Sequence, residues 1–159
     1  MQTNARLIFT KGPGKTDRLE VCRDGVSTER IDCPKQRIIP HDMVHYAVER
    51  VLQRRGFIRR VLDGEAADFR MAADLESDGV ERLVEVFQAD GWAGWNTPAE
   101  DLLAMYRVTC QARRCPELAV SLQDLESVRE RLLQLTRQWQ SVGVGESLAL
   151  PAVDDPLPD

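Results

Sequence analysis

Both histidines of this chain lie in one short segment, IIPHDMVHYAVE at residues 38–49, and they are four positions apart. On a helix, residues at that spacing project from nearly the same side, so His41 and His45 can present two imidazoles to one ion. Asp42 directly follows the first histidine, and Glu49 lies four positions after the second. The segment therefore predicts a divalent-metal site with His41 and His45 as ligands. We favour zinc as the ion and a metal-dependent hydrolase as the leading function.

The residues around the pair predict the helix that this spacing requires. Pro40 suits the first turn of a helix, where its missing N–H costs nothing, and the charge of Asp42 is favourable there. Gly56 fits the position just past the other end, with Arg54 and Arg55 in the last turn. At about 100° per residue, the histidines lie towards one edge of an apolar stripe and the carboxylates lie further round, on its polar side. The stripe consists of Val44, Ala47, Val48, Val51 and Leu52.

A metal site on this helix needs further carboxylates, and the helix geometry limits which of them can serve. Glu49 lies about 12 Å from His41 along the helix axis, so one ion cannot easily reach both histidines and Glu49. We expect Glu49 to hold the ring of His45 instead, because a ligating imidazole needs a partner that fixes its tautomer. The third ligand must then come from another part of the chain. The candidates are Glu65, Glu81, Glu85 and a nearby aspartate.

Over five residues the segment resembles the zincin metalloprotease motif H-E-x-x-H. His41 and His45 match the two zinc-ligand positions, and Asp42 stands where the motif has its glutamate. The resemblance implies that Asp42 is the catalytic residue, acting as the general base or supporting the ligands. Aspartate is one methylene shorter than glutamate, and Val48 and Val51 stand where metzincins continue with glycine and histidine. The likeness is therefore limited to the ligand positions.

A longer resemblance is to bacterial proteins of unassigned function that have a strand-rich start followed by a P-H-D-x-x-H-Y-x-V-E helix. The matching residues are Pro40, His41, Asp42, His45, Tyr46, Val48 and Glu49. This similarity covers most of the chain. It supplies no activity that could be assigned to the histidines.

The alternative function is that of a non-catalytic interaction protein whose histidines are structural. Apolar residues repeat at seven-residue spacing in the last third of the chain and predict a seam along a helix from residue 116 to about residue 142. The seam contains Leu118, Leu125, Val128, Leu132, Leu135 and Trp139. It packs either within the chain or across a homodimer through residues 118–139. A metal site predicts a third carboxylate or thiol near both imidazoles, whereas the interaction protein predicts backbone-bonded histidines and an exposed apolar helix face.

The elements that position the pair predict an α+β fold, with a small N-terminal antiparallel sheet followed by a bundle of four or five helices. Residues 5–33 alternate like a three-stranded meander, and residues 146–153 resemble a returning strand. Helical patterns follow at residues 40–55, 57–64, 77–91, 97–114 and 116–142, with TPAE at residues 97–100 as a capping box. We expect one domain at residues 1–153 and a loose tail at residues 154–159.

Composition and charge exclude several classes of partner. A net charge of −5 does not attract phosphate backbones, so we expect no nucleic-acid partner. The arginine cluster at positions 50, 54, 55, 59 and 60 is typical of a solvated helix face. No apolar run reaches the length of a membrane span and no secretion signal is recognisable, so we expect a cytoplasmic protein with reduced cysteines and no membrane partner.

One glycine-rich turn imitates a nucleotide site. GPGKT at residues 12–16 resembles the end of a phosphate-binding P-loop, but Phe9 stands where that motif needs its first glycine. The motif also needs a helix after Thr16, and the residues that follow alternate like a strand. We therefore expect no nucleotide cofactor.

Overall fold

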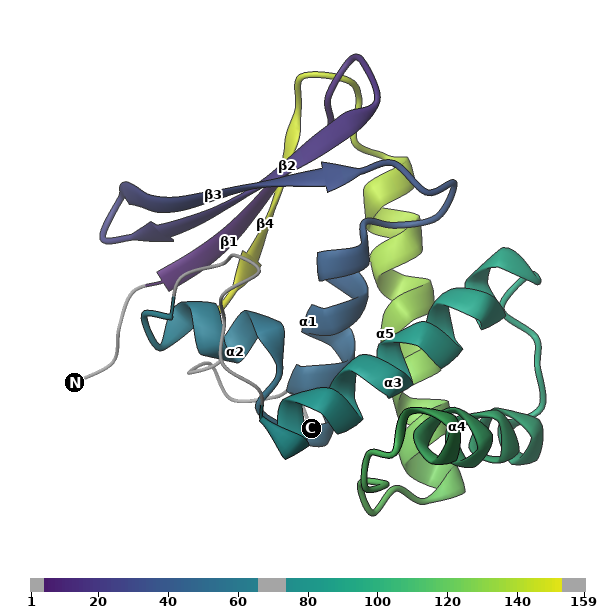
Figure 1. The fold of residues 1–159 in the computed structure, drawn as a ribbon. Helices are drawn as coiled ribbons and strands as arrows, with labels where there is room; N and C mark the ends of the chain where they lie inside the picture. Colours follow the sequence, from purple (N-terminus) through teal and green to yellow (C-terminus); the bar gives the residue numbers. More distant parts are fainter. Residues whose placement is uncertain (1–4, 66–73, 153–159) are drawn as a thin grey trace.

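The computed structural model describes residues 5–65 and 74–152, and it confirms the α+β class. Figure 1 shows a sheet at one end of the molecule and helices packed beneath it. The strands are β1 (Ala5–Thr10), β2 (Thr16–Arg23), β3 (Val26–Pro34) and β4 (Ser147–Pro151). They form one antiparallel sheet in the order β3-β2-β1-β4, so the C-terminal strand completes the N-terminal meander as predicted.

Alternation along the strands explains how the sheet covers the helices. Leu7 and Phe9 of β1 and Leu19 and Val21 of β2 are buried on one face, while their neighbours in sequence are more exposed. A strand follows the GPGKT turn, as its sequence indicated. The predicted tail at residues 154–159 lies outside the described residues.

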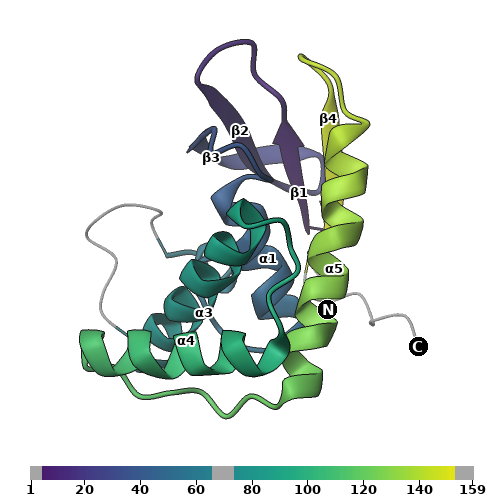
Figure 2. The same cartoon turned by 90° about the vertical axis from the view of Figure 1, so that its right-hand side faces the viewer.

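The helices are α1 (His41–Leu52), α2 (Phe57–Leu62), α3 (Leu75–Trp92), α4 (Ala99–Arg113) and α5 (Leu122–Gln140). In Figures 1 and 2, α5 runs from the α4 end of the molecule up to the sheet, where it leads into β4. Helix α1 contacts α2, α3, α5 and β3 and is therefore the central helix of the fold. None of the described helices is long and apolar enough to cross a membrane.

The central position of α1 changes the expected surroundings of the histidines. Residues Asp42 to Arg50 are all buried, so the helix has no polar face turned to solvent. The prediction of carboxylates on a polar side is therefore wrong. Asp42 and Glu49 lie inside the protein, where each needs a hydrogen-bond partner from another element.

Three helix ends differ from the sequence patterns. α1 ends at Leu52 because Gln53 takes the left-handed conformation, with φ 54°, and Gly56 instead precedes α2. The predicted capping box at residues 97–100 is absent, since the Thr97 N–H donates to the buried carboxylate of Asp90. The last helix does not begin at Pro116 but after Ser121, which forms a capping box with the side chain at position 124.

The apolar seam of α5 is packed inside the chain. Leu125, Val128, Leu132 and Leu135 are fully buried, and α5 contacts α1 and α4. Leu118 precedes the helix and packs on α3, where Gly79 leaves room for its side chain. The seam therefore packs within the chain, which is one of the two alternatives that the sequence left open. A homodimer through residues 118–139 would have to use the polar side of α5 and stays a prediction.

Leu132→Ala is expected to lower the free energy of unfolding by about 3 kcal/mol, because it opens a cavity where the side chain has no exposed surface. Urea unfolding followed by circular dichroism measures the loss. Leu75→Ala is the matched control, since Leu75 is 66% exposed, and it should change stability by less than about 0.5 kcal/mol. Equal losses in the two variants would mean that the seam is not the core.

The arginine cluster also differs from the expected solvated face. Arg50 and Arg60 are buried: Arg50 donates to the carbonyl of Ala152, and Arg60 forms an ion pair with Glu65 at 2.8 Å. The other three arginines of the cluster are partly exposed and pair with acidic side chains. The arginines of the cluster thus pair largely within their own chain.

Candidate metal centre

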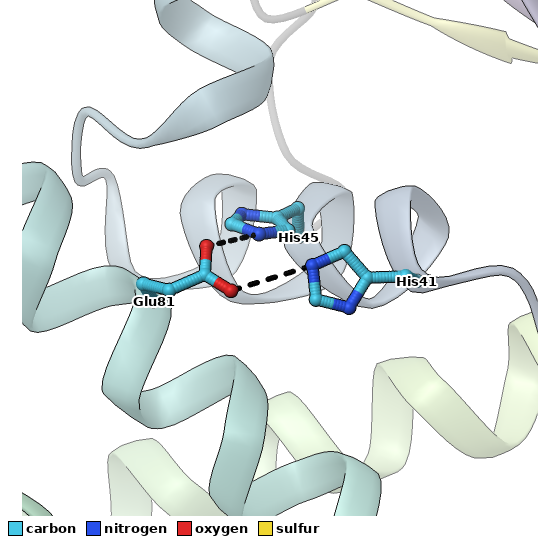
Figure 3. Close-up of side chains that lie close together, drawn as sticks. All are labelled: His41, His45 and Glu81. Atoms are coloured by element: carbon cyan, nitrogen blue, oxygen red, sulfur yellow. Dashed lines mark ion pairs between the residues drawn. The ribbon is translucent and has the colours of Figure 1, made fainter. Parts of the chain in front are cut away.

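The two histidines project from the same side of α1, and Glu81 reaches between them from α3 (Figure 3). His41 Nε2 lies 3.4 Å from Glu81 Oε1, and His45 Nε2 lies 2.8 Å from Glu81 Oε2. The ring centroids of the histidines are 4.8 Å apart. The ligand atoms of the three residues all lie within 4.8 Å of one another, so this group could hold a metal ion.

Both imidazoles are held from behind through the nitrogen that does not face Glu81. His45 Nδ1 lies 3.1 Å from Glu49 Oε2, as the four-residue spacing predicted, and His41 Nδ1 lies 2.8 Å from Gln88 Oε1. With each Nδ1–H donating to its oxygen, each Nε2 faces Glu81, as an N–H donor when the imidazole is protonated and with its lone pair when it is neutral. Ligating histidines in metal sites usually have this second partner.

Glu49 is itself fixed by the start of α2. Its Oε1 accepts hydrogen bonds from the backbone N–H groups of Gly56 and Arg59, and its Oε2 accepts one from the N–H of Ile58. A carboxylate at a helix N-terminus satisfies N–H groups that lack partners within the helix. Glu49 therefore connects the N-terminus of α2 to the ring of His45.

Among the predicted third ligands, only Glu81 lies with the histidines. Glu65 pairs with Arg55 and Arg60, and Glu85 pairs with Arg82 and Arg113. No sequence pattern singled out Gln88 as a partner of His41. Its only signal is its spacing of seven residues from Glu81, which places both on one face of α3.

The three side chains of the group shift one another's pKa values. Burial lowers the pKa of His45, but hydrogen bonds with Glu49 and Glu81 outweigh burial and raise that pKa to about 10. For His41, burial likewise lowers the pKa, and the contacts with Glu81 and Gln88 raise it above its usual value. Burial raises the pKa of Glu81, but both histidines hold it well below its usual range. These shifts favour protonated imidazoles beside an ionised Glu81 in the metal-free protein.

The burial of the three side chains leaves one side of the group open. His45 is 1% exposed, whereas the side chains of His41 and Glu81 are 37% and 33% exposed. Among the described residues the group has three members. Structural zinc sites are closed by four protein ligands, and catalytic sites have three with one position left for water or substrate.

Asp42 is not part of this group. Its carboxylate points to β3 and lies 3.4 Å from the Sγ of Cys33, which donates a hydrogen bond to it. Burial raises the pKa of Asp42, and the positive charge of the two histidines opposes that effect. The catalytic role of Asp42 therefore stays a prediction. Asp42 lies next to His41 in the chain, but it is not one of the three residues that could hold the ion.

The four cysteines should divide into two classes of reactivity. Burial raises the pKa of the Cys33 thiol and raises that of Cys110 to about 11, and both side chains are enclosed by the core. Cys22 and Cys115 are partly exposed. Titration with a disulfide reagent should label Cys22 and Cys115 in the native protein and the other two only after unfolding. A single rate for all four would contradict the burial of Cys33 beside Asp42.

No protein-family model matches the sequence, and comparisons with curated proteins and with solved structures found no match. The resemblance of residues 40–49 to bacterial proteins with the P-H-D-x-x-H-Y-x-V-E helix stays a prediction. The function must be argued from the geometry of the group itself.

Proposed function

We propose that the protein is a metal-dependent hydrolase whose zinc ion is held by His41, His45 and Glu81. The observation that carries the proposal is the convergence of His41 Nε2, His45 Nε2 and the Glu81 carboxylate, while both Nδ1 atoms face oxygen acceptors. Two histidines and one glutamate form the ligand set of several zinc hydrolases. Zinc in such a site polarises a carbonyl and lowers the pKa of a bound water.

The contacts of the histidines favour this function over the interaction protein. The interaction protein predicts histidines bonded to backbone and an exposed apolar helix face. Instead, His41 and His45 contact side chains of α1 and α3, and the apolar face of α5 is buried. His45 faces two carboxylates at a buried position, and a metal cation could take the place of its proton there, which supports a metal-binding role.

Asp42 is the residue that we assign to proton transfer. Asp42 follows His41 on α1, and both residues line the same pocket. Burial raises the pKa of Asp42, which makes the carboxylate a better proton acceptor. In this role, Asp42 would accept a proton from the water that attacks the carbonyl and deliver it to the leaving group, and the thiol of Cys33 holds its carboxylate in place.

The hydrolase proposal is tested with zinc-loaded and zinc-free protein on a panel of chromogenic esters, peptides and phosphate esters. We expect zinc-dependent hydrolysis of at least one class. Asp42→Asn should bind zinc normally and lower kcat by a factor of about 10²–10⁴, the usual contribution of a general base. Asp101→Asn, an exposed change on α4 away from the three candidate ligands, is the control. Equal rates with and without zinc on every substrate class would overturn the hydrolase assignment.

A further inference from the structure

A pocket of about 360 Å³ lies beside the metal group, between the end of β3 and the first residues of α1 and α2. It is lined by Ile31, Asp32, Cys33 and Pro34 of β3, by Gln36 after that strand, by His41 and Asp42 of α1 and by Phe57 of α2. Three separate elements therefore enclose it. The pocket size falls at the lower end of the range of about 300–1,000 Å³ that small-molecule sites occupy.

Two residues join the pocket to the metal group. His41 lines the pocket and also turns its Nε2 towards Glu81. Phe57 lines the pocket and also packs on His45, with ring centroids 5.8 Å apart. A molecule in the pocket therefore touches the ring of one candidate ligand and the aromatic wall of the other.

The chemistry of the lining favours an apolar guest. Ile31 and Phe57 are partly exposed there although they pack against the core, and Pro34 adds a third apolar surface. Among the polar lining residues, Cys33 donates to Asp42 and the Gln36 amide donates to the carbonyl of Ile39, while Asp32 is exposed to solvent. Covering the apolar side chains is favourable in proportion to the area removed from water.

The larger cavity near Glu49 has a different character. It has a volume of about 440 Å³, and Arg54, Arg55 and Arg59 line it. These arginines already pair with Glu76, Asp63 and Glu65. An anionic guest would have to displace those pairs, whereas an apolar guest in the smaller pocket displaces none.

We propose that the substrate of the metal centre is a small molecule with an aromatic or branched aliphatic group next to the carbonyl that ligates the metal. The pocket lined by Ile31, Pro34 and Phe57 binds this apolar group, and it holds the carbonyl beside His41. The inference rests on the proposed function, because it concerns the substrate of the same metal centre.

Two hydroxamates test the pocket, since both ligate zinc through the same two oxygens and differ only in the attached group. Acetohydroxamate carries a methyl group and benzohydroxamate a phenyl ring. Isothermal titration of the zinc-loaded protein should show at least about tenfold tighter binding of benzohydroxamate. Ile31→Trp fills the pocket and should reduce this preference to less than about twofold, while acetohydroxamate keeps its affinity.

Val26→Trp is the matched control, because Val26 lies on the same strand, is 63% exposed and does not line the pocket. It should keep the full preference for benzohydroxamate. Equal affinities of the two hydroxamates for the wild-type protein, or a preference that survives in Ile31→Trp, would overturn the substrate assignment. A preceding titration with zinc chloride separates this failure from that of the metal site, because only the latter abolishes zinc binding itself.

Discussion

Glu49→Gln is expected to lower the free energy of unfolding by about 3 kcal/mol or more, a large loss for an isosteric change. The carboxylate is 4% exposed, and both of its oxygens are in use. One accepts from Gly56 and Arg59, and the other accepts from Ile58 and faces His45. An amide has only one acceptor oxygen, so its NH₂ group must face at least one of the backbone N–H donors without forming a bond.

Urea unfolding of the metal-free protein measures this loss. Glu76→Gln is the control, because the ion pair of Glu76 with Arg54 is 3.6 Å long and more than a third exposed. The control should change stability by less than about 0.5 kcal/mol. Zinc affinity should also fall in Glu49→Gln by a factor of about 10–100, because His45 loses the partner that orients it. If Glu49→Gln were as stable as the wild-type protein, Glu49 would not be the residue that connects α2 to His45.

Zinc is expected to stabilise the protein more strongly at high pH than at low pH. The ion needs unprotonated imidazoles, so protons compete with it at His41 and His45. Where free zinc is a hundredfold above its dissociation constant, the gain in unfolding free energy is about 2.7 kcal/mol. Thermal unfolding with zinc and with a chelator, at about pH 6 and about pH 9, measures the gain at each pH.

The metal-free protein should show the opposite trend with pH. The pKa of His45 is raised in the folded chain, so its contribution to stability is present below the ordinary histidine value of 6.5 and is lost as the pH rises towards about 10. The pKa of Glu81 is lowered, so its contribution is present above the ordinary value of 4.5 and is lost as the pH falls below it.

In the zinc experiment, a gain in unfolding free energy that is larger at about pH 6 than at about pH 9 would contradict the competition between zinc and protons at the histidines.

The local part of the site could be predicted from the sequence because α1 alone determines it. His41 and His45 share a side of the helix through their spacing, and the same spacing placed Glu49 behind His45. The third ligand depends on where α3 packs against α1, and sequence spacing does not contain that information. Glu81 was therefore one of several candidates, and Gln88 was missed.

The environment of α1 was harder to predict for the same reason. Its apolar stripe indicated a half-exposed helix, yet the sheet, α2, α3 and α5 surround it. The polar residues Asp42, Glu49 and Arg50 are buried because Cys33, the start of α2 and the carbonyl of Ala152 satisfy them from other elements. Tertiary contacts of this kind override the pattern of a single helix.

The helix ends show a competition between similar local signals. Pro116 is compatible with the start of a helix, but α5 begins at the capping box of Ser121. Gly56 is compatible with the end of a helix, but α1 ends at the left-handed Gln53. The strands were easier, because their alternation and glycine-rich turns are local. The returning strand β4 was also predicted, although its partner β1 lies far away in sequence.

The zinc content of the protein after equilibrium dialysis is the measurement that tests the metal centre most directly. Elemental mass spectrometry should find one zinc per chain in the untagged wild-type protein and in Glu85→Gln, a matched change one helical turn from Glu81 on α3. Glu81→Gln and His45→Ala should retain little or none. Absence of zinc in the wild-type protein, or full retention in Glu81→Gln, would contradict the site formed by His41, His45 and Glu81.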